Sequence, residues 1–345
     1  MRKQLLFIAL LVAGTCLNSF SQQKTAKLFP DSLVQPRMRV IIDNDFGGDP
    51  DGLFELVQHL LSPSVEIRGI IGSHLRAGDG WDPSKESAAH AKQKIEEVLK
   101  IMNLGNVYPV YQGSNIALEN DSTAQRSDAA NAIVKEAMRD DTKLPLYVVC
   151  GAGLTDIASA YLLEPKIASR LTLIWIGGPE YPELATPPPG YTTLEYNLAI
   201  DLTAGQVIFN KSTIPIWQVP RNVYRQVIMP YSSLLTKVKT QGKIGEYLTA
   251  NIERIMQLSI KYHFSVGEVY IVGDSPLVLL TALQSSFEPD PSSSFYALRP
   301  SPIINSQGIY EVNHKGRNIR VYTHVDVPLL LEDLYSKLQL FNQSR

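Results

Sequence analysis

Four aspartates lie within nine residues near the start of the chain, at Asp43, Asp45, Asp49 and Asp51. They follow the apolar run 40–42, which has the pattern of a buried parallel strand. Open α/β sheets bind their ligands at such strand ends. Four like charges on one short turn repel each other, and a hard oxygen-seeking cation such as Ca²⁺ is the simplest compensation. The alternative is a solvated turn, because Asp is a common turn residue.

The spacing of these aspartates also matches positions 1, 3, 7 and 9 of an EF-hand loop, with Gly48 at position 6. Position 12 of that loop must supply a bidentate glutamate, and here it is Phe54. The segment before the loop has a strand pattern, whereas an EF-hand begins with a helix. We therefore reject an EF-hand.

Strand and helix patterns alternate along the chain from residue 40 onward, which is the rhythm of a parallel sheet with helices on both faces. The segment 295–325 alternates in the manner of antiparallel strands. We predict an α/β fold with a single large domain, a mostly parallel central sheet flanked by helices, and a β-rich C-terminal segment. The expected strands are 40–42, 65–73, 107–111, 146–150, 171–176, 215–219 and 270–272, and the expected helices are 84–104, 128–139, 154–163, 199–209, 231–262 (one or two), 276–283 and 328–340.

Residues 1–21 have the pattern of a secretory signal peptide. The positive charges of Arg2 and Lys3 precede the apolar run 5–17, which is too short to span a bilayer comfortably. A small-residue cleavage site follows at 19–21. We therefore expect export to the periplasm or the extracellular space.

The polar segment 22–38 is predicted to be a linker, and 39–345 a single domain. Anchoring as a lipoprotein through Cys16 is an alternative, although Thr15 before it is atypical. No other stretch is long enough to span a membrane.

The composition excludes several classes of protein. The chain has 345 residues, 44% of them hydrophobic, so it can bury a large core. Loss of Arg2 and Lys3 with the signal peptide takes the formal net charge from −2 to −4, which gives no electrostatic footprint for nucleic acid. Cys150 then remains without a disulfide partner in the chain, and six scattered histidines do not have the spacing of a zinc site.

The opening turn, Asp43-Asn44-Asp45-Phe46-Gly47-Gly48-Asp49-Pro50-Asp51, resembles the N-terminal aspartate motif of the nucleoside hydrolase superfamily, whose members prefer inosine and uridine. It is most similar to the GGDPD-type motif of the bacterial nucleoside hydrolase-like branch. Other family landmarks recur in the same order over residues 38–340, and the ordered set is more specific than any one motif. They stand at 110–113 (VYQG), 151–158 (GAGLTDIA), 176–178 (IGG), 195–197 (EYN) with Asp201, 220–224 (PRNVY) and 274–277 (DSPL).

The resemblance implies a Rossmann-related fold and hydrolysis of the N-glycosidic bond of a ribonucleoside, or a related N-ribosyl compound, by a calcium-bound water. Asp45 would be both a calcium ligand and the general base. Asp51, the backbone carbonyl near Gly151 and Asp274 would be the other ligands. Such chemistry is physically consistent, since calcium accepts carboxylates, carbonyls and sugar hydroxyls in one flexible shell.

For the substrate, the resemblance places Asp49 at a ribose hydroxyl, and Glu195 and Asn197 at the sugar. His74, at the end of the second strand, either contacts the sugar or base or is a hydrogen-bonded strand-end residue. His263 lies in a region where relatives often place base-contacting residues. Glu195 and Asn197 could instead be a polar turn and helix cap. We expect Trp81 and Trp217 to pack, and Asp201 to be structural.

The chain departs from the family pattern at 273–276, where Gly-Asp-Ser-Pro stands in place of the family's HDP. Aligned on the proline, Ser275 would take the ligand position. We prefer Asp274, because a calcium site needs its charge. The histidine that helps the base to leave in purine-specific relatives is absent. In addition, Asp156 stands where the family has Asn, and Asn222 where it has Asp.

These observations leave three hypotheses. The first is a calcium-dependent N-ribohydrolase of the family's kind, acting on a small nucleoside or ribosyl ligand. The second is a binding protein on the same fold that cleaves nothing, and it is motivated by the missing histidine. The third is calcium with a structural role only. The resemblance also implies a homodimer or homotetramer, and this expectation rests on the resemblance alone.

Overall fold

The computed structural model describes residues 28–191, 194–285, 287 and 292–345. The predicted signal peptide 1–21, Cys16 and the first part of the predicted linker therefore lie outside the described residues. No helix among those described is both long and apolar enough to cross a membrane.

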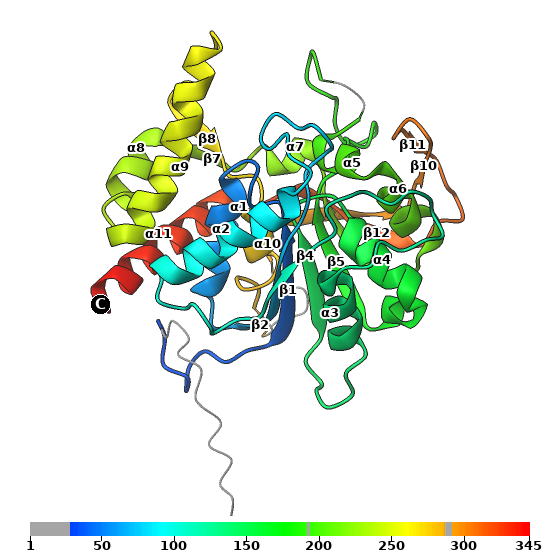
Figure 1. Ribbon diagram of the computed structural model, residues 1–345, viewed down its shortest axis with the longest axis horizontal. Coiled ribbons are helices and arrows are strands. Elements are labelled where there is room, and N and C mark those ends of the chain that lie inside the picture. The colour runs from blue at the N-terminus through cyan, green and yellow to red at the C-terminus, as the bar shows by residue number, and fades with distance from the viewer. Residues whose placement is uncertain (1–27, 192–193, 286, 288–291) are drawn as a thin grey trace, which may run out of the picture.

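An eight-stranded sheet forms the centre of the molecule, in the order β3-β2-β1-β4-β5-β6-β12-β9 (Figure 1). All its neighbouring strands pair in parallel except β9, which runs antiparallel to β12. The predicted α/β fold is thus confirmed. The strands are β1 (Met38–Asn44), β2 (Val65–Gly72), β3 (Val110–Gln112), β4 (Leu146–Cys150), β5 (Leu171–Ile176), β6 (Ile216–Val219), β9 (Phe295–Pro300) and β12 (Asn318–His324).

Successive side chains of the central strands enter two different cores, one on each face of the sheet. On β1, Val40 and Ile42 join the core formed with α1 (Asp51–Leu60), whereas Ile41 joins the opposite one. This is the two-residue period of a strand that is buried on both faces. The first core also takes in α2 (Ser87–Ile101), α9 (Gly242–Lys261) and α11 (Val327–Gln343), and the second α3 (Asp128–Ala137), α4 (Thr155–Leu163) and α6 (Leu202–Gln206).

The predicted helix 199–209 is interrupted. It divides into α5 (Tyr196–Ile200), α6 and a π-helical turn (Val207–Lys211). Asp201 stands at the break, because its Oδ1 accepts a hydrogen bond from Ala204 N over 2.8 Å and so caps α6. Its Oδ2 is bonded to the Thr155 hydroxyl over 2.7 Å. The structural role expected of Asp201 accounts for the break.

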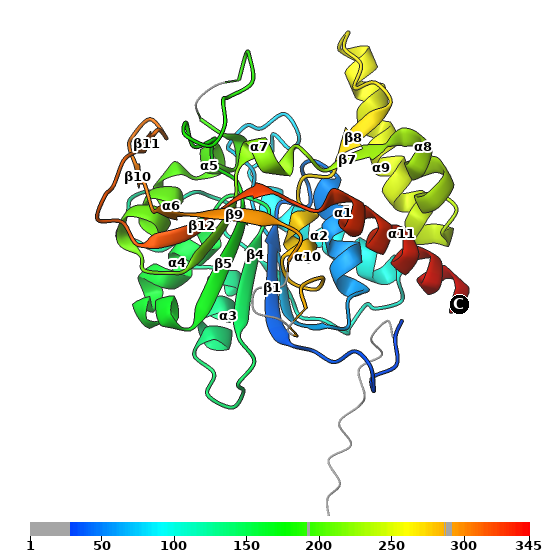
Figure 2. The ribbon, with the colours of Figure 1, turned by 180° about the vertical axis from the view of Figure 1, so that it is seen from behind.

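The C-terminal segment differs from the purely antiparallel arrangement that its sequence suggested. β12 lies between β6 and β9, parallel to the first and antiparallel to the second, and the β9–β12 pair is also visible from behind (Figure 2). The remaining strands of this segment, β10 (Ile303–Ile304) and β11 (Tyr310–Glu311), form a separate small ribbon. The last helix, α11, begins and ends close to the predicted bounds.

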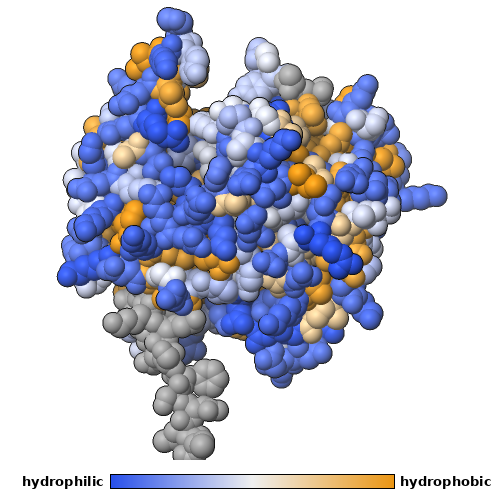
Figure 3. Space-filling view, viewed as in Figure 1, coloured by the Kyte–Doolittle hydropathy of each residue, from blue (hydrophilic) through white to orange (hydrophobic). Residues whose placement is uncertain are grey.

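A projecting arm rises from the end of the molecule at which α5 and α7 (Arg221–Tyr224) lie (Figure 1). It consists of α8 (Tyr231–Ser233), the carboxyl end of α9 and the two-stranded ribbon of β7 (Ile228–Pro230) and β8 (Val269–Ile271). The face seen in Figure 3 is largely hydrophilic, with hydrophobic residues on this arm and in separate patches elsewhere. The short helix α10 (Pro276–Leu279) follows β8 and leads the chain back to the body.

Candidate active site

A cavity of about 200 Å³ opens where β1, β4 and β5 end. It brings together residues from seven separated parts of the chain, including the opening turn and the stretch 273–274 after β8. Its walls contain all the residues predicted to hold the metal and those predicted to bind the sugar, apart from the two histidines. The lining residues are Asp45, Asp49, Asp51, Trp81, Gly151, Ile176, Glu195, Tyr196, Asn197, Tyr224, Gly273 and Asp274.

The acidic turn is held by its own backbone. Gly48 N donates to Asp45 O over 2.7 Å, and Asp45 N donates to Asn44 Oδ1 over 2.8 Å. Asp51 is the first residue of α1, and Gly52 N donates to its Oδ1 over 3.0 Å. The free N–H groups of a first helical turn favour an acidic residue at this position. The acidic residues of the turn therefore lie between the end of β1 and the start of α1.

Two buried carboxylates, Asp45 and Asp274, and two half-buried ones, Asp49 and Asp51, gather here, and their electrostatics is unfavourable without a counter-ion. Burial raises the pKa of Asp45 well above its usual value, and the charges of Asp51 and Asp49 raise it further. Burial and the charge of Asp274 do the same to the pKa of Asp51. The pKa of Asp274 is likewise raised well above normal, first by burial and then by Asp45. Asp45, Asp51 and Asp274 thus resist ionisation first because of their burial and then because of one another's charge.

Asp49 is the least perturbed of the four. Burial raises its pKa to about 6, while hydrogen bonds from the Tyr270 hydroxyl and the Asp51 backbone oppose the rise. The Tyr270 hydroxyl lies 2.8 Å from Asp49 Oδ1. Asp43, by contrast, does not line the cavity: it is fully buried behind the turn and accepts a hydrogen bond from the Ser73 hydroxyl.

The donor set fits a hard cation by its chemistry. Asp45, Asp51 and Asp274 offer carboxylate oxygens and Gly151 a backbone carbonyl, which are the ligand types that calcium prefers. Among the described residues that line the cavity, none is Lys, Arg or His, so no side chain there balances the acids. Within the described part of the chain, however, no three His, Cys, Asp or Glu side chains stand in metal-binding geometry. The residues suit a cation, but they are not already arranged around one.

The structure of the segment after β8 distinguishes the two alignments of residues 273–276 that the sequence allowed. Asp274 reaches the cavity wall, whereas Ser275 precedes α10 as its N-cap and is fully buried. The Ser275 hydroxyl has no hydrogen-bond partner among the described residues. The geometry therefore favours Asp274 over Ser275 as the residue that faces the acids of the turn.

Glu195 and Asn197 each combine a structural contact with a place in the wall. Glu195 caps α5, because its Oε2 accepts from Leu198 N over 3.0 Å, and its Oε1 accepts from the Tyr224 hydroxyl over 2.8 Å. Asn197 Nδ2 donates to the carbonyls of Gly151, over 3.1 Å, and Ile176, over 2.8 Å. The cap and the binding-site interpretations of this motif therefore describe the same residues.

The structure does not bring the two predicted histidines to the cavity. His74 is buried with both ring nitrogens occupied, Nε2 at 2.8 Å from the Thr155 hydroxyl and Nδ1 at 2.8 Å from Leu75 O. Its role among the described residues is that of a hydrogen-bonded strand-end residue, the second of the two possibilities. His263 lies exposed beyond the end of α9, with a left-handed backbone (φ 64°). Neither residue lines the cavity.

Three aromatic residues of the wall were missed from the sequence. Trp81 was expected to pack, but it lines the cavity and is 37% exposed. Tyr196 and Tyr224 also line it, and both lie inside motifs that had been singled out for other residues. Trp217 does pack as expected, with its ring 5.4 Å from that of Tyr147.

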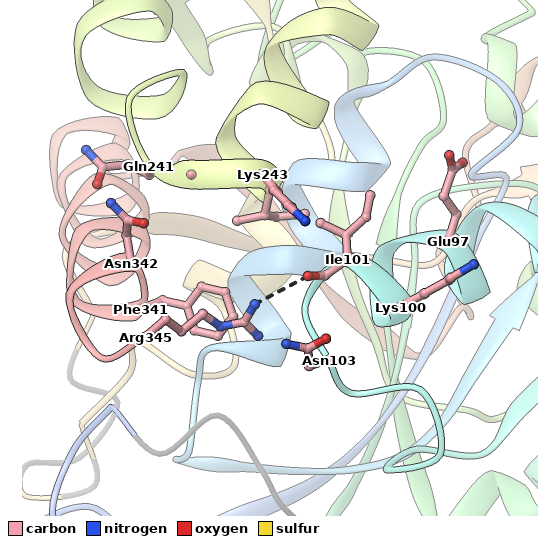
Figure 4. A pocket seen from close by; sticks show the side chains of 11 residues that line it. Glu97, Lys100, Ile101, Asn103, Gln241, Lys243, Phe341, Asn342 and Arg345 are labelled. Carbon is pink, nitrogen blue, oxygen red and sulfur yellow. Dashed lines mark hydrogen bonds between the residues drawn. The ribbon is translucent and has the colours of Figure 1, made fainter.

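A second and larger cavity, of about 660 Å³, lies apart from these residues (Figure 4). It is bounded by the carboxyl ends of α2 and α11 and by the start of α9. Arg345 Nη1 reaches across it to Ile101 O over 3.3 Å. None of the predicted site residues lines it, and its most basic members, Lys100, Lys243 and Arg345, are exposed.

Comparisons with known proteins identify the family to which the sequence is similar. The model of the family described as inosine-uridine preferring nucleoside hydrolase matches residues 40–332. The inosine-uridine preferring nucleoside hydrolase of Crithidia fasciculata is 32% identical over 125 residues, which are 35% of this chain and 36% of that protein's length.

Solved structures are similar in fold at low sequence identity. A plant nucleoside hydrolase, PpNRh1, superposes with a TM-score of 0.66 at 17% identity, over 88% of this chain and 99% of the other. A purine-preferring ribonucleoside hydrolase from Gardnerella vaginalis superposes with a TM-score of 0.67 at 18% identity, over 89% and 100% of the two chains.

Proposed function

Because this chain belongs to the inosine-uridine preferring nucleoside hydrolase family, we propose that it hydrolyses the N-glycosidic bond of a ribonucleoside or a related N-ribosyl compound. The family match confirms the resemblance found in the sequence motifs. The observation that carries the proposal is the cavity itself, in which Asp45, Asp49, Asp51 and Asp274 gather with Glu195 and Asn197.

We propose Ca²⁺ as the cofactor, held by Asp45, Asp51, Asp274 and the carbonyl of Gly151. Support comes from the mutual elevation of the carboxylate pKa values and from the absence of basic side chains among the described wall residues. When bound, such an ion supplies positive charge that lowers the pKa of water. It also favours the ionised form of the carboxylates around it.

Asp45 is the proposed general base. Its carboxylate lines the cavity, is close enough to Asp51 and Asp49 to interact with their charges, and would accept a proton from the attacking water. Asp49, Glu195 and Asn197 are proposed to bind the ribosyl hydroxyls. Cleavage of a glycosidic bond develops positive charge on the sugar, in an oxocarbenium-like state, and the surrounding anionic groups stabilise that charge.

A direct assay tests this proposal. Purified protein without residues 1–21 is incubated with calcium and a panel of purine and pyrimidine nucleosides, and free ribose is measured. We expect release from at least one nucleoside and a loss of about 10²–10⁴-fold in kcat for Asp45→Asn, the usual contribution of a general base. Asp140→Asn, at an exposed acid paired with Arg170, is the matched control and should be fully active. No ribose from any nucleoside would contradict the proposal.

A second candidate is a protein that binds a nucleoside or sugar and does not cleave it. It is favoured by one observation: the chain lacks the family histidine at 273–275, and no histidine lines the cavity among the described residues. Calorimetry that finds tight nucleoside binding, together with no turnover over days, would select this candidate over the enzyme.

We also propose that the protein is exported, from the signal-like pattern of residues 1–21. Mass spectrometry of the mature protein from its native cells should find an N-terminus at Gln22. An N-terminus at a lipid-modified Cys16 would select the lipoprotein alternative. A homodimer or homotetramer remains the proposed assembly, to be measured by light scattering.

A further inference from the structure

One buried amide, that of Asn44, contacts both halves of the acidic site. Asn44 is the last residue of β1 and is fully buried. Its Oδ1 accepts the hydrogen bond from Asp45 N over 2.8 Å. Its Nδ2 donates to Asp274 Oδ2 over 2.9 Å. A single side chain thus spans from the opening turn to the segment after β8, which lies 230 positions further along the chain.

Two glycines leave the space that this amide occupies. A Cβ at Gly52, in the first turn of α1, would lie 2.9 Å from Asn44 Nδ2. A Cβ at Gly151, just after β4, would collide with the same atom. The amide is therefore wedged between the start of a helix and the end of a neighbouring strand, with little room for another rotamer.

A second buried chain of polar groups lies behind Asn44. Glu55, one turn after Asp51 on α1, is bonded through Oε1 to His59 Nδ1, and His59 Nε2 lies 2.9 Å from the Thr281 hydroxyl. Glu55 Oε2 has no hydrogen-bond partner among the described residues, although the Asn44 amide is close enough to lower the pKa of Glu55. Thr281 lies seven residues after Asp274, so this segment is bonded to α1 through His59 as well as to β1 through Asn44.

A neutral donor suits this place for an electrostatic reason. Asp274 is buried among acids, and a Lys or Arg beside it would neutralise the charge that a cation needs. An amide orients one carboxylate oxygen by a hydrogen bond and leaves the net charge of Asp274 unchanged. Asp274 Oδ1 makes no hydrogen bond to any residue that the structure describes, and so it is free to bind a ligand.

We propose that Asn44 is a positioning residue, which holds the Asp274 carboxylate beside Asp45 so that one cation site forms from two distant parts of the chain. The identity of the cation rests on the proposed function, whereas the Asn44–Asp274 contact does not. Asn44 itself touches neither substrate nor cation in this account. Its effect on cation binding passes through the carboxylate of Asp274 and through the backbone of Asp45.

The test is a double-mutant cycle on calcium affinity, measured by calorimetry with calcium chloride alone. Asn44→Ala should weaken calcium binding at least tenfold. In an Asp274→Ala background the same change should weaken binding by a clearly smaller factor, because the carboxylate that Asn44 orients is gone and only its bond to Asp45 N remains. Equal weakening in both backgrounds, or no weakening in the native background, would overturn the proposal.

Gln58→Ala is the matched control. Gln58, which lies on α1, is also a fully buried amide, and its Nε2 bonds Leu330 O over 3.1 Å and Asp333 over 2.8 Å, away from the site. It should lower the unfolding midpoint and leave the calcium affinity within twofold of the parent. If Asn44→Ala does not fold, Gly52→Ala replaces it, because its Cβ presses on the same amide.

A failure of the proposed function is distinguishable from a failure of this inference. If the parent protein neither binds calcium nor cleaves a nucleoside, the proposed function fails. The four proteins of the cycle, which are the parent, the two single variants Asn44→Ala and Asp274→Ala, and the double variant, are then unfolded in urea with a chelator. If the changes in unfolding midpoint caused by Asn44→Ala and Asp274→Ala are not additive in the double variant, the Asn44–Asp274 contact is supported. If they are additive, the contact is rejected.

Discussion

The hydroxyl of Tyr270 donates a hydrogen bond to Asp49 Oδ1 over 2.8 Å, and so ties β8 to the acidic turn that follows β1. Together with the Asn44–Asp274 bond, it fixes the turn from the C-terminal part of the chain at two points. Both contacts come from the short stretch 270–274. The position of the proposed sugar-binding aspartate therefore depends on a strand that belongs to the projecting arm.

Tyr270→Phe removes this hydrogen bond with almost no change of shape. A hydrogen bond to a charged group contributes about 1.5–3 kcal/mol, so we expect kcat/KM for a cleaved nucleoside to fall by about tenfold or more. Tyr231→Phe is the control, since its hydroxyl bonds Glu253 over 3.0 Å on the same arm but outside the site. Equal kinetics of the two variants would show that Asp49 does not depend on Tyr270.

Removal of calcium should destabilise the protein. At a calcium concentration about 100 times its Kd, binding adds about 2.7 kcal/mol to the free energy of unfolding, and a chelator removes that amount. Asp51→Ala should lose most of this increment, while Asp121→Ala, at an exposed acid paired with Lys211, should keep it. The measurement is thermal unfolding with and without calcium.

The same variant distinguishes a structural from a functional ion. If Asp51→Ala lowers the melting temperature but leaves nucleoside affinity and turnover intact, calcium serves structure alone. The proposed hydrolase requires both to change.

The two tryptophans should respond differently to truncation. Trp81→Ala should raise KM about tenfold with little loss of stability, because Trp81 lines the cavity and base stacking on an aromatic ring contributes about 1–3 kcal/mol. Trp217→Ala should lower the free energy of unfolding by about 2 kcal/mol and leave KM unchanged, because Trp217 packs on Tyr147 and under Arg320. Steady-state kinetics and urea unfolding of both variants check this contrast.

Asp156 gives the protein a specific pH dependence of stability. Burial raises its pKa, while hydrogen bonds from Ser127 and Ser114 oppose the rise, and Asp156 in turn raises the pKa of buried Asp43. A carboxyl with a raised pKa in the folded state stabilises the fold fully below the unfolded pKa, near 4. That contribution is lost as the pH rises through the folded value.

Asp156→Asn removes this titration and supplies the residue that the family motif has at this position. The free energy of unfolding of the variant should therefore fall less between pH 4 and pH 8 than that of the parent, by on the order of 1 kcal/mol. Urea unfolding across this range, with a chelator present, measures the difference. Parallel profiles for parent and variant would refute the assignment, and Asp140→Asn, an exposed acid, should follow the parent.

The fold was largely predictable because local sequence patterns specify most of its helices and strands. Apolar runs such as 146–150 and 171–176 coincide with β4 and β5 residue for residue, since strands buried on both faces must be continuously apolar. The break at Asp201 was not predictable in the same way. Its cause is a pair of tertiary contacts, to Leu118 and Thr155, that no helical period reveals.

The site was predictable where acids were clustered or motifs were ordered, and not where a role depends on a distant partner. His74 stands at a strand end, as expected, but Thr155 and Leu75 O take both of its nitrogens. Asn44 was overlooked between two aspartates, because an amide in a turn has no distinctive pattern until Asp274 is placed beside it. Trp81 gave no signal at all, since a lone aromatic residue in a loop looks the same whether it packs or binds.

The position of β12 has a consequence for the order in which the molecule is made. This strand closes the sheet between β6 and β9, and yet it follows all the other strands of that sheet in the sequence. A nascent chain that ends after α9 carries the acidic turn without Asp274 and without the strand that completes the sheet. Contacts of such long sequence separation form late and slowly. We therefore expect the proposed cation site to assemble only once the segment that contains Asp274 has folded back onto the acidic turn.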